Sequence, residues 1–195
     1  MNQVLDRRQQ ILATAGDLFR EHGYHATSIR DIAKSLDMRG SSLYAHVDSK
    51  EQMLLEIVTE AAGAFLQGAE GVDKELAPAE RLRALVRGHL AVIVDELPNA
   101  TVFFHEWRFL SGDLKASIIL RRDAYEQHFR NTIRQGVEQG VFEVDDVKTA
   151  TLFVLSALNW SYQWFSSEGM LSVDELTEKY TALIFNALKL KEVQP

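Results

Sequence analysis

The side chains best suited to bind a polyanion lie between Gly23 and Lys50. Hydroxyl groups can hydrogen bond to phosphates, and an arginine can donate two parallel hydrogen bonds to a guanine. Two expected helix starts, at Thr27-Ser28 and at Ser49-Lys50, add backbone N–H groups suited to phosphate oxygens. The candidate DNA contacts are Thr27, Ser28, Arg39, Gly40, Ser41, Ser42, Tyr44, His46 and Lys50.

The charge of the chain is unevenly distributed. The net charge of −7 at pH 7 disfavours nucleic acid when the chain is taken as a whole. Residues 1–50, however, hold seven Lys and Arg against six Asp and Glu, and the remaining residues hold fourteen against twenty-two. The first quarter can therefore approach a phosphate backbone without strong repulsion, and the acidic remainder keeps non-specific DNA binding weak.

Helices must position these polar side chains. An apolar stripe in residues 11–19 indicates a first helix that ends at Gly23. Ser28 and Asp31 match a capping box, which predicts the start of a short second helix. A new start signal over residues 48–52 then opens a long helix that runs to about residue 67.

A short third helix is expected between the second and the long one, holding Leu43, Tyr44 and Val47. Two short helices joined by a tight turn and packed on a longer first helix form a helix-turn-helix. In such an arrangement Leu43 and Val47 anchor the second short helix and leave its polar side chains to face DNA. The pattern therefore predicts a DNA-binding function.

Helical periodicity continues beyond a polar connector at residues 68–78. Gly140 is the expected stop of one helix, and Ser172 with Glu175 is a further capping box. The expected helices cover roughly 79–96, 99–110, 113–138, 145–165 and 172–190. The predicted fold is all-α, with a three-helix DNA-binding unit over residues 1–50 and a helical effector and dimerisation bundle over residues 51–195.

Two segments rich in aromatic residues, 103–109 and 159–165, contain all three tryptophans of the chain. Aromatic walls with a few polar groups suit a cavity for a small molecule. The alternative is that these aromatics belong to the core or to a dimer interface. The candidate ligand-binding residues are Phe103, Phe104, Trp107, Arg108, Arg122, Tyr125, Asn159, Trp160, Gln163 and Trp164.

Enzyme chemistry finds little support in the sequence. His105-Glu106 is similar to the start of a zinc-protease helix, but Phe109 stands where the second histidine is required. The chain has no cysteine, no Gly-rich phosphate loop and no nucleophile elbow. We therefore expect no enzyme activity, no metal and no cofactor. The polar N-terminus and the lack of an apolar run of about 18 residues predict a cytoplasmic protein without a membrane span.

The N-terminal segment resembles the tetracycline-repressor (TetR) family over about the first 55 residues. It departs from the usual family pattern at Ser41, where a glycine is common, and at Val47, where a phenylalanine is common. The matching residues are Phe19, Gly23, Tyr24, Thr27, Ile32, Ala33, Leu43, Tyr44, His46, Ser49, Lys50 and Glu51.

The resemblance implies a homodimer through the last two helices, binding to double-stranded operator DNA, and repression relieved by a small-molecule inducer. The apolar residues that suit such an interface are Leu152, Phe153, Leu155, Leu158, Leu183, Ile184 and Leu188. They fit the core of a bundle as well. The aromatic segments also resemble a subgroup of the family that responds to acyl-CoA thioesters.

A CoA ester would need cations for its phosphates, and the bundle offers several arginines. A solvated face is the alternative for Arg121 and Arg122, which can pair with Asp123. Two other functions stay open, namely a repressor with a broad pocket for hydrophobic drugs and a helical adaptor for protein interactions. The available arginines are Arg81, Arg83, Arg87, Arg108, Arg121 and Arg122.

Overall fold

The computed structural model describes residues 6–95, 97–165 and 171–191, and this part of the chain contains helices and no strands. The predicted all-α class is confirmed. No helix in the described ranges is long and apolar enough to cross a membrane. The helices are α1 (Arg7–His22), α2 (Ile29–Ser35), α3 (Gly40–Leu43), α4 (Lys50–Glu70), α5 (Pro78–Asp95), α6 (Leu97–Glu106), η1 (Trp107–Phe109), α7 (Gly112–Glu138), α8 (Val147–Trp160), η2 (Ser161–Gln163) and α9 (Val173–Ala187), where η marks a 3₁₀-helix.

The chain forms two compact units. The first unit combines residues 1–62 with residues 98–119, and the second combines residues 63–97 with residues 120–195. The boundary predicted after residue 50 lies within the first unit. That boundary separates two functions, DNA binding and ligand binding, and it stays a prediction.

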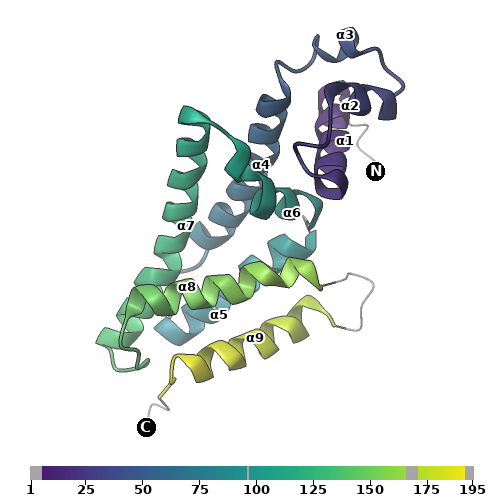
Figure 1. Ribbon diagram of the computed structural model, residues 1–195. Helices are drawn as coiled ribbons and strands as arrows, with labels where there is room; N and C mark the ends of the chain where they lie inside the picture. Colours follow the sequence, from purple (N-terminus) through teal and green to yellow (C-terminus); the bar gives the residue numbers. More distant parts are fainter. Residues whose placement is uncertain (1–5, 96, 166–170, 192–195) are drawn as a thin grey trace. The chain divides into compact units, whose positions relative to one another are not determined.

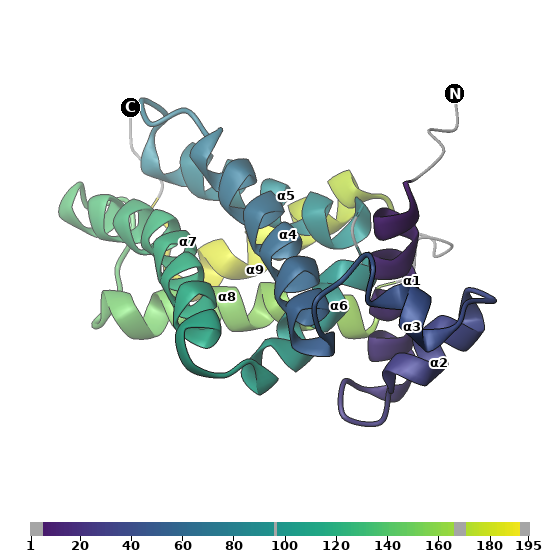
Figure 2. The ribbon, with the colours of Figure 1, turned by 90° about the horizontal axis from the view of Figure 1, so that it is seen from above.

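In the first unit α2 packs against both α1 and α3 (Figure 2). Ile11 and Phe19 of α1, Ile32 of α2 and Leu43 of α3 are at most 1% exposed and form the core of this group. The predicted capping box at the start of α2 is confirmed, because the Ser28 side chain accepts from the backbone N–H of Asp31 and the Asp31 carboxylate accepts from that of Ser28.

The third helix is shorter than the sequence predicts. Helix α3 ends at Leu43, and Tyr44–His46 form a turn closed by hydrogen bonds such as the one from the His46 N–H to the Leu43 carbonyl, 2.9 Å long. Glycine and serine have low helix propensity, which limits the length of this element. The anchoring role of Leu43 and Val47 is nevertheless confirmed, since both side chains are buried.

In the second unit α5 packs against α9 and α8 (Figure 1). Leu82 and Leu90 of α5, Leu158 of α8 and Ile184 of α9 are at most 2% exposed and belong to one hydrophobic core. The helix predicted over 145–165 starts at Val147 and ends at Trp160, after which η2 follows. The capping box predicted at Ser172 and Glu175 is confirmed at the start of α9.

The end of α7 depends on two glycines. Gly140 has φ of 71°, in the left-handed region that favours glycine, and the predicted helix stop at this residue is confirmed. Gly136 packs against the buried ring of Phe142, such that a Cβ atom at residue 136 would lie 2.2 Å from the Phe142 Cδ2 atom. The close return of the chain after α7 therefore requires glycine at this position.

Candidate functional site

The outward side of α3 and of the turn after it is polar. Leu43 and Val47 are buried, whereas the side chains between and before them are exposed, with Tyr44 at 55%. This alternation leaves a surface of hydroxyl, imidazole and guanidinium groups on a rigid hydrophobic anchor. The exposed predicted DNA contacts on this α3 surface are Arg39, Ser41, Ser42, Tyr44 and His46.

Arg39 and Gly40 form the start of α3. Arg39 is the N-cap residue, its side chain makes no capping hydrogen bond, and its guanidinium has no hydrogen-bond or ion-pair partner in the described part of the chain. A Cβ at Gly40 would meet nothing within 4 Å, so this glycine is open to its surroundings. The cation of the α3 surface is thus available to an external anion.

Two of the predicted contacts are used inside the unit. The Thr27 hydroxyl donates to the carbonyls of Leu18 and Gly23, at 3.1 and 3.0 Å, and its side chain is only 2% exposed. Ser28 is exposed, but its N–H and its hydroxyl both donate to the carboxylate of Asp31. These hydrogen bonds hold the pKa of Asp31 below its usual value. The side chain of Thr27 therefore stabilises the loop between α1 and α2.

The side chain of Lys50 also has hydrogen-bond partners within the first unit. Its ammonium donates to the carbonyls of Tyr24 and Thr27, both at 2.9 Å, and lies 4.2 Å from the centre of the Tyr24 ring. Burial lowers the pKa of Lys50. This lysine stabilises the loop between α1 and α2. The sequence had predicted that it contacts a phosphate of DNA instead.

The structure adds residues to this region that the sequence reasoning missed. The Glu106 carboxylate accepts from the backbone N–H of Tyr24 at 3.0 Å, and the Phe109 ring lies 6.1 Å from the Tyr24 ring and 4.2 Å from that of His25. Glu51 accepts from the N–H and the hydroxyl of one further residue, Ser111. Residues 106–111 thus contact the loop between α1 and α2 and the start of α4, although the sequence offered only an aromatic run as a signal.

The first predicted ligand segment lies in the first unit. Phe103 is buried, and its ring lies 5.3 Å from that of Phe104. Trp107 is half-buried with the ammonium of Lys115 5.9 Å from its ring, and Arg108 donates to the His105 carbonyl at 2.7 Å. These contacts lie within the first unit.

The second predicted ligand segment lies in the second unit. Trp160 is 63% exposed, and Trp164 is 50% exposed with its ring parallel to that of Tyr180 at 6.2 Å. The Gln163 amide donates to the Tyr162 hydroxyl at 2.6 Å, and Asn159 is half-buried. The two predicted ligand segments therefore belong to different units.

Tyr125 is partly buried in the second unit, beside the buried His89. Its hydroxyl is 2.8 Å from the Nδ1 atom of His89, and its ring packs near those of Phe65 and Phe129. Burial raises the pKa of Tyr125 and lowers that of His89 to about 3, so both side chains are neutral at pH 7. Burial also lowers the pKa of Arg122. The interior of this unit thus offers polar groups within aromatic surroundings.

The remaining arginines differ in their partners. Arg83 pairs with Glu178 at 2.9 Å and Arg87 pairs with Asp174 at 2.8 Å. Arg81 donates to the neutral side chain of Gln135 instead. Among the described residues no group of His, Asp and Glu could hold a metal ion.

The apolar residues predicted for a dimer interface divide into two sets. Leu155, Leu158, Ile184 and Leu188 are at most 8% exposed and belong to the core of the second unit. Three others have exposed side chains. These exposed residues are Leu152 at 44%, Phe153 at 56% and Leu183 at 67%.

Two family models match the chain. The one described as "Bacterial regulatory proteins, tetR family" matches residues 11–57, and the one described as "Tetracyclin repressor-like, C-terminal domain" matches residues 75–188. Together they cover the helix-turn-helix and nearly all of the second unit. The resemblance that the N-terminal residues indicated thus extends to the C-terminal part.

Relatives and solved structures agree over nearly the whole chain. The HTH-type transcriptional repressor KstR2 of Mycobacterium tuberculosis is 28% identical over 189 residues, which cover 95% of this chain and 94% of the relative. The structure of the TetR-family regulator PfmR from Thermus thermophilus superposes with a TM-score of 0.82 at 35% identity, covering 96% and 100%. AibR in complex with isovaleryl coenzyme A and operator DNA gives a TM-score of 0.83 at 27% identity, covering 92% and 98%.

Proposed function

Since the chain belongs to the TetR family of bacterial regulatory proteins, we propose that it is an operator-binding homodimer released from DNA by an acyl-CoA thioester. As a member of this family it is a DNA-binding transcriptional repressor and not an enzyme. In this proposal residues 1–50 contact DNA, and residues 51–195 bind the ligand and dimerise. A bacterial operator lies in the cytoplasm, where we expect the protein to act.

The α3 surface is the observation that carries the DNA-binding proposal. Its hydroxyls and the unpaired Arg39 lie on an element fixed by the buried Leu43, which is the arrangement that a recognition helix needs in a major groove. One such helix reads a half-site, so a dimer reads a palindrome. The half-sites are then expected about one helical turn, roughly 34 Å, apart or a multiple of it.

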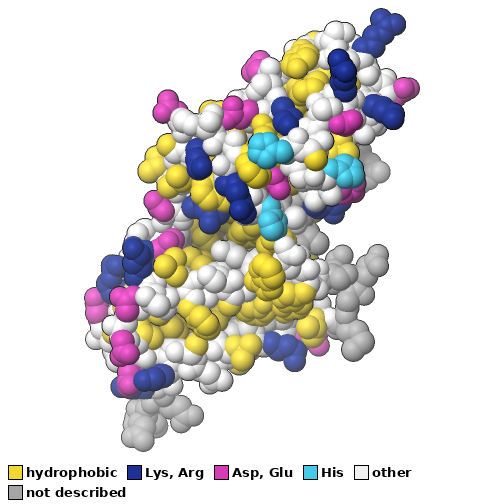
Figure 3. All heavy atoms as spheres, in the orientation of Figure 1, with side chains coloured by type: hydrophobic (Ala, Val, Ile, Leu, Met, Phe, Trp, Pro, Cys, Tyr) yellow, Lys and Arg dark blue, Asp and Glu magenta, His cyan; other side chains and the backbone are white. Residues whose placement is uncertain are grey.

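Exposed apolar side chains on α8 and α9 support the dimer. Figure 3 shows hydrophobic side chains over the face that α8 presents, and on α8 and α9 the exposed ones include Phe153, Trp160 and Leu183. Large exposed apolar patches mark interfaces more often than free surface. Phe153→Glu and Leu183→Glu should therefore yield monomers in light scattering, with helical circular dichroism retained. Variants that remain dimeric would place the interface elsewhere.

The acyl-CoA proposal rests on chemical fit and on the AibR complex with isovaleryl coenzyme A. The second unit combines the partly buried Tyr125 and the buried His89 with aromatic rings, and Arg122 adds a half-buried cation for a phosphate. An apolar acyl group would be stabilised by about 0.8 kcal/mol per buried methylene. Affinity should therefore increase with chain length until the cavity is full.

Two experiments test this function. Selection of bound fragments from genomic DNA should return a palindrome, and fluorescence anisotropy should then measure release by acyl-CoAs of increasing length. Free CoA and free acids are the controls. Equal binding of free acids and thioesters would favour the broad drug-type pocket, and failure to recover any palindrome would favour the protein-interaction adaptor.

A further inference from the structure

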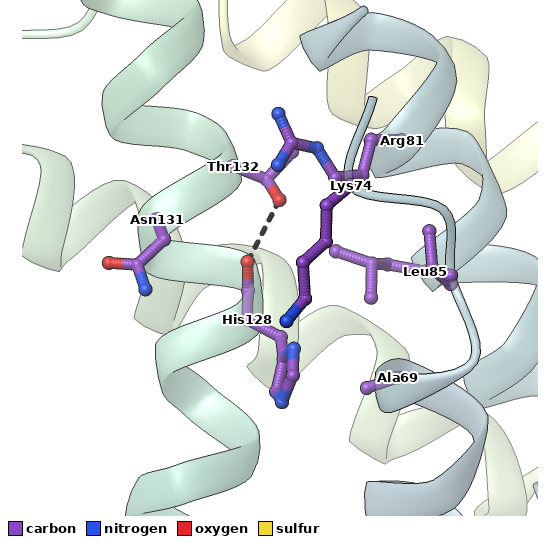
Figure 4. Close-up of a pocket in the computed structure, with 8 residues that line it drawn as sticks. Ala69, Lys74, Arg81, Leu85, His128, Asn131 and Thr132 are labelled. Atoms are coloured by element: carbon purple, nitrogen blue, oxygen red, sulfur yellow. Dashed lines mark hydrogen bonds between the residues drawn. The ribbon is translucent and has the colours of Figure 1, made fainter. Parts of the chain in front are cut away.

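A cavity separate in its residues from those proposed for the inducer lies within the second unit. It is partly open and is lined by the end of α4, the connector to α5, the first turns of α5 and the C-terminal half of α7 (Figure 4). Its volume is about 250 Å³, and one wall is apolar, formed by Ala69, Val72 and Leu85. At about 30 Å³ for each water, this volume suits a molecule of about eight heavy atoms.

The polar lining of this cavity is cationic. Lys74 and Arg81 both line it, and no Asp or Glu is among its lining residues. The Lys74 ammonium has no hydrogen-bond or ion-pair partner in the described ranges of the chain. Arg81 donates to Gln135, which is neutral, and so its charge is also not compensated by a carboxylate. Figure 4 shows the Lys74 side chain extending toward His128.

The remaining polar groups of the lining add donors. The Asn131 side-chain oxygen accepts from Arg134 at 3.1 Å, and its exposed amide N–H groups have no acceptor among the described residues. Burial, the largest influence, lowers the pKa of His128, Lys74 lowers it further, and Glu70 opposes both. The ring is therefore neutral at pH 7 and offers one N–H. The Thr132 hydroxyl is occupied with the His128 carbonyl at 2.9 Å.

A set made of cations and N–H donors is satisfied by an acceptor that carries negative charge. Cations that form no ion pair, beside an apolar wall, match a ligand with both an anionic head and an apolar body. We propose that this cavity binds a small organic anion, a carboxylate or phosphate monoester with a short aliphatic tail, with its head at Lys74 and Arg81 and its tail on Leu85. This second ligand site is independent of the identity of the inducer.

The test uses the full-length protein and ligands of matched length. Isothermal titration with hexanoate and hexyl phosphate should show binding, whereas hexanol and hexylammonium should not bind. The tighter of the two anions identifies the headgroup of the natural ligand. Binding of hexanol equal to that of both anions would overturn the proposal, because the cavity would then be merely apolar.

Variants assign the binding to this cavity. Lys74→Met removes an exposed, unpaired charge, so the protein should fold normally and bind the anions at least tenfold more weakly. Arg81→Met should have a similar effect, and Lys148→Met, which removes an exposed lysine at the start of α8, should have none. Wild-type affinity in Lys74→Met would overturn the proposal. Displacement of hexanoate by an acyl-CoA in simple competition would also overturn it, because the site would then be part of the inducer pocket.

Discussion

On the α3 surface Arg39 has no partner in the described part of the chain, whereas on α5 Arg83 and Arg87 hold the carboxylates of Glu178 and Asp174 at 2.9 and 2.8 Å. An exposed ion pair adds little stability, but it does neutralise a cation locally. The number of cations therefore does not mark an anion-binding surface. Cations without a carboxylate partner mark it, and by this criterion Arg39 on the α3 surface and Lys74 and Arg81 in the cavity differ from Arg83 and Arg87 of α5.

Substitutions on the α3 surface should have the largest effect on operator affinity. The double variant Arg39→Ala/Tyr44→Ala should lose roughly 100-fold in operator affinity, about 2.8 kcal/mol, because it removes two exposed groups that face DNA. Fluorescence anisotropy at fixed salt measures the loss. Arg83→Ala is the matched control, and its operator affinity should be unchanged. An equal loss in both variants would refute the distinction between paired and unpaired cations.

Substitutions in the interior of the second unit should change the free energy of unfolding and not the affinity for DNA. Gly136→Ala places a methyl group 2.2 Å from a ring carbon of Phe142, and overpacking of this kind costs about 2 kcal/mol of unfolding free energy. Urea unfolding measures the change. In Gly63→Ala the new methyl group meets nothing within 4 Å, so this helix variant should be as stable as the wild type or more so. A neutral Gly136→Ala variant would show that the Phe142 ring moves aside easily.

The buried His89 predicts a dependence of stability on pH. Its pKa is about 3 in the folded protein because of burial, and it returns to about 6.5 on unfolding. The unfolded state then binds a proton that the folded state does not, so stability is lost as the pH falls below 6.5. The loss from this group is about 2 kcal/mol at pH 5.

Urea unfolding at pH 7 and pH 5 checks this contribution. In His89→Gln the difference between the two pH values should shrink by about 2 kcal/mol, whatever the stability of the variant at pH 7. His46→Gln, which removes an exposed histidine, should leave the difference as in the wild type. A pH dependence retained in His89→Gln would assign the effect to other groups.

The smallest effect concerns Lys50, a cation of the first unit that has internal partners. Lys50→Met leaves the carbonyls of Tyr24 and Thr27 without their donor and loosens the loop, so operator affinity should fall about tenfold. The slope of log affinity against log salt should not change, because no phosphate contact is lost. A lysine on a phosphate would contribute about 0.9 to that slope. A flatter slope in Lys50→Met would therefore show that the ammonium moves onto DNA.

Much of the architecture was determined by the sequence alone, because its signals are local. The capping boxes at Ser28 and Ser172 place residues three positions apart, and the stop at Gly140 depends on one residue's backbone conformation. The anchors Leu43 and Val47 follow from helical spacing in the same way. The predicted DNA contacts on α3 and its following turn were therefore found on one surface, although their contact with DNA stays a prediction.

Tertiary structure decided the roles that depend on residues distant in the chain. The sequence predicts that Lys50 binds a phosphate. In the structure its ammonium donates to the carbonyl of Tyr24, which lies 26 residues earlier in the chain. In the sequence Glu106 is only a member of an aromatic segment. In the structure its carboxylate accepts from the backbone N–H of Tyr24, 82 residues away. Periodicity states which side of a helix is apolar but not which partner covers it. Periodicity could therefore not predict that Leu158 is buried and Phe153 exposed. Nor could it predict that Lys74, Arg81 and His128 line the same cavity.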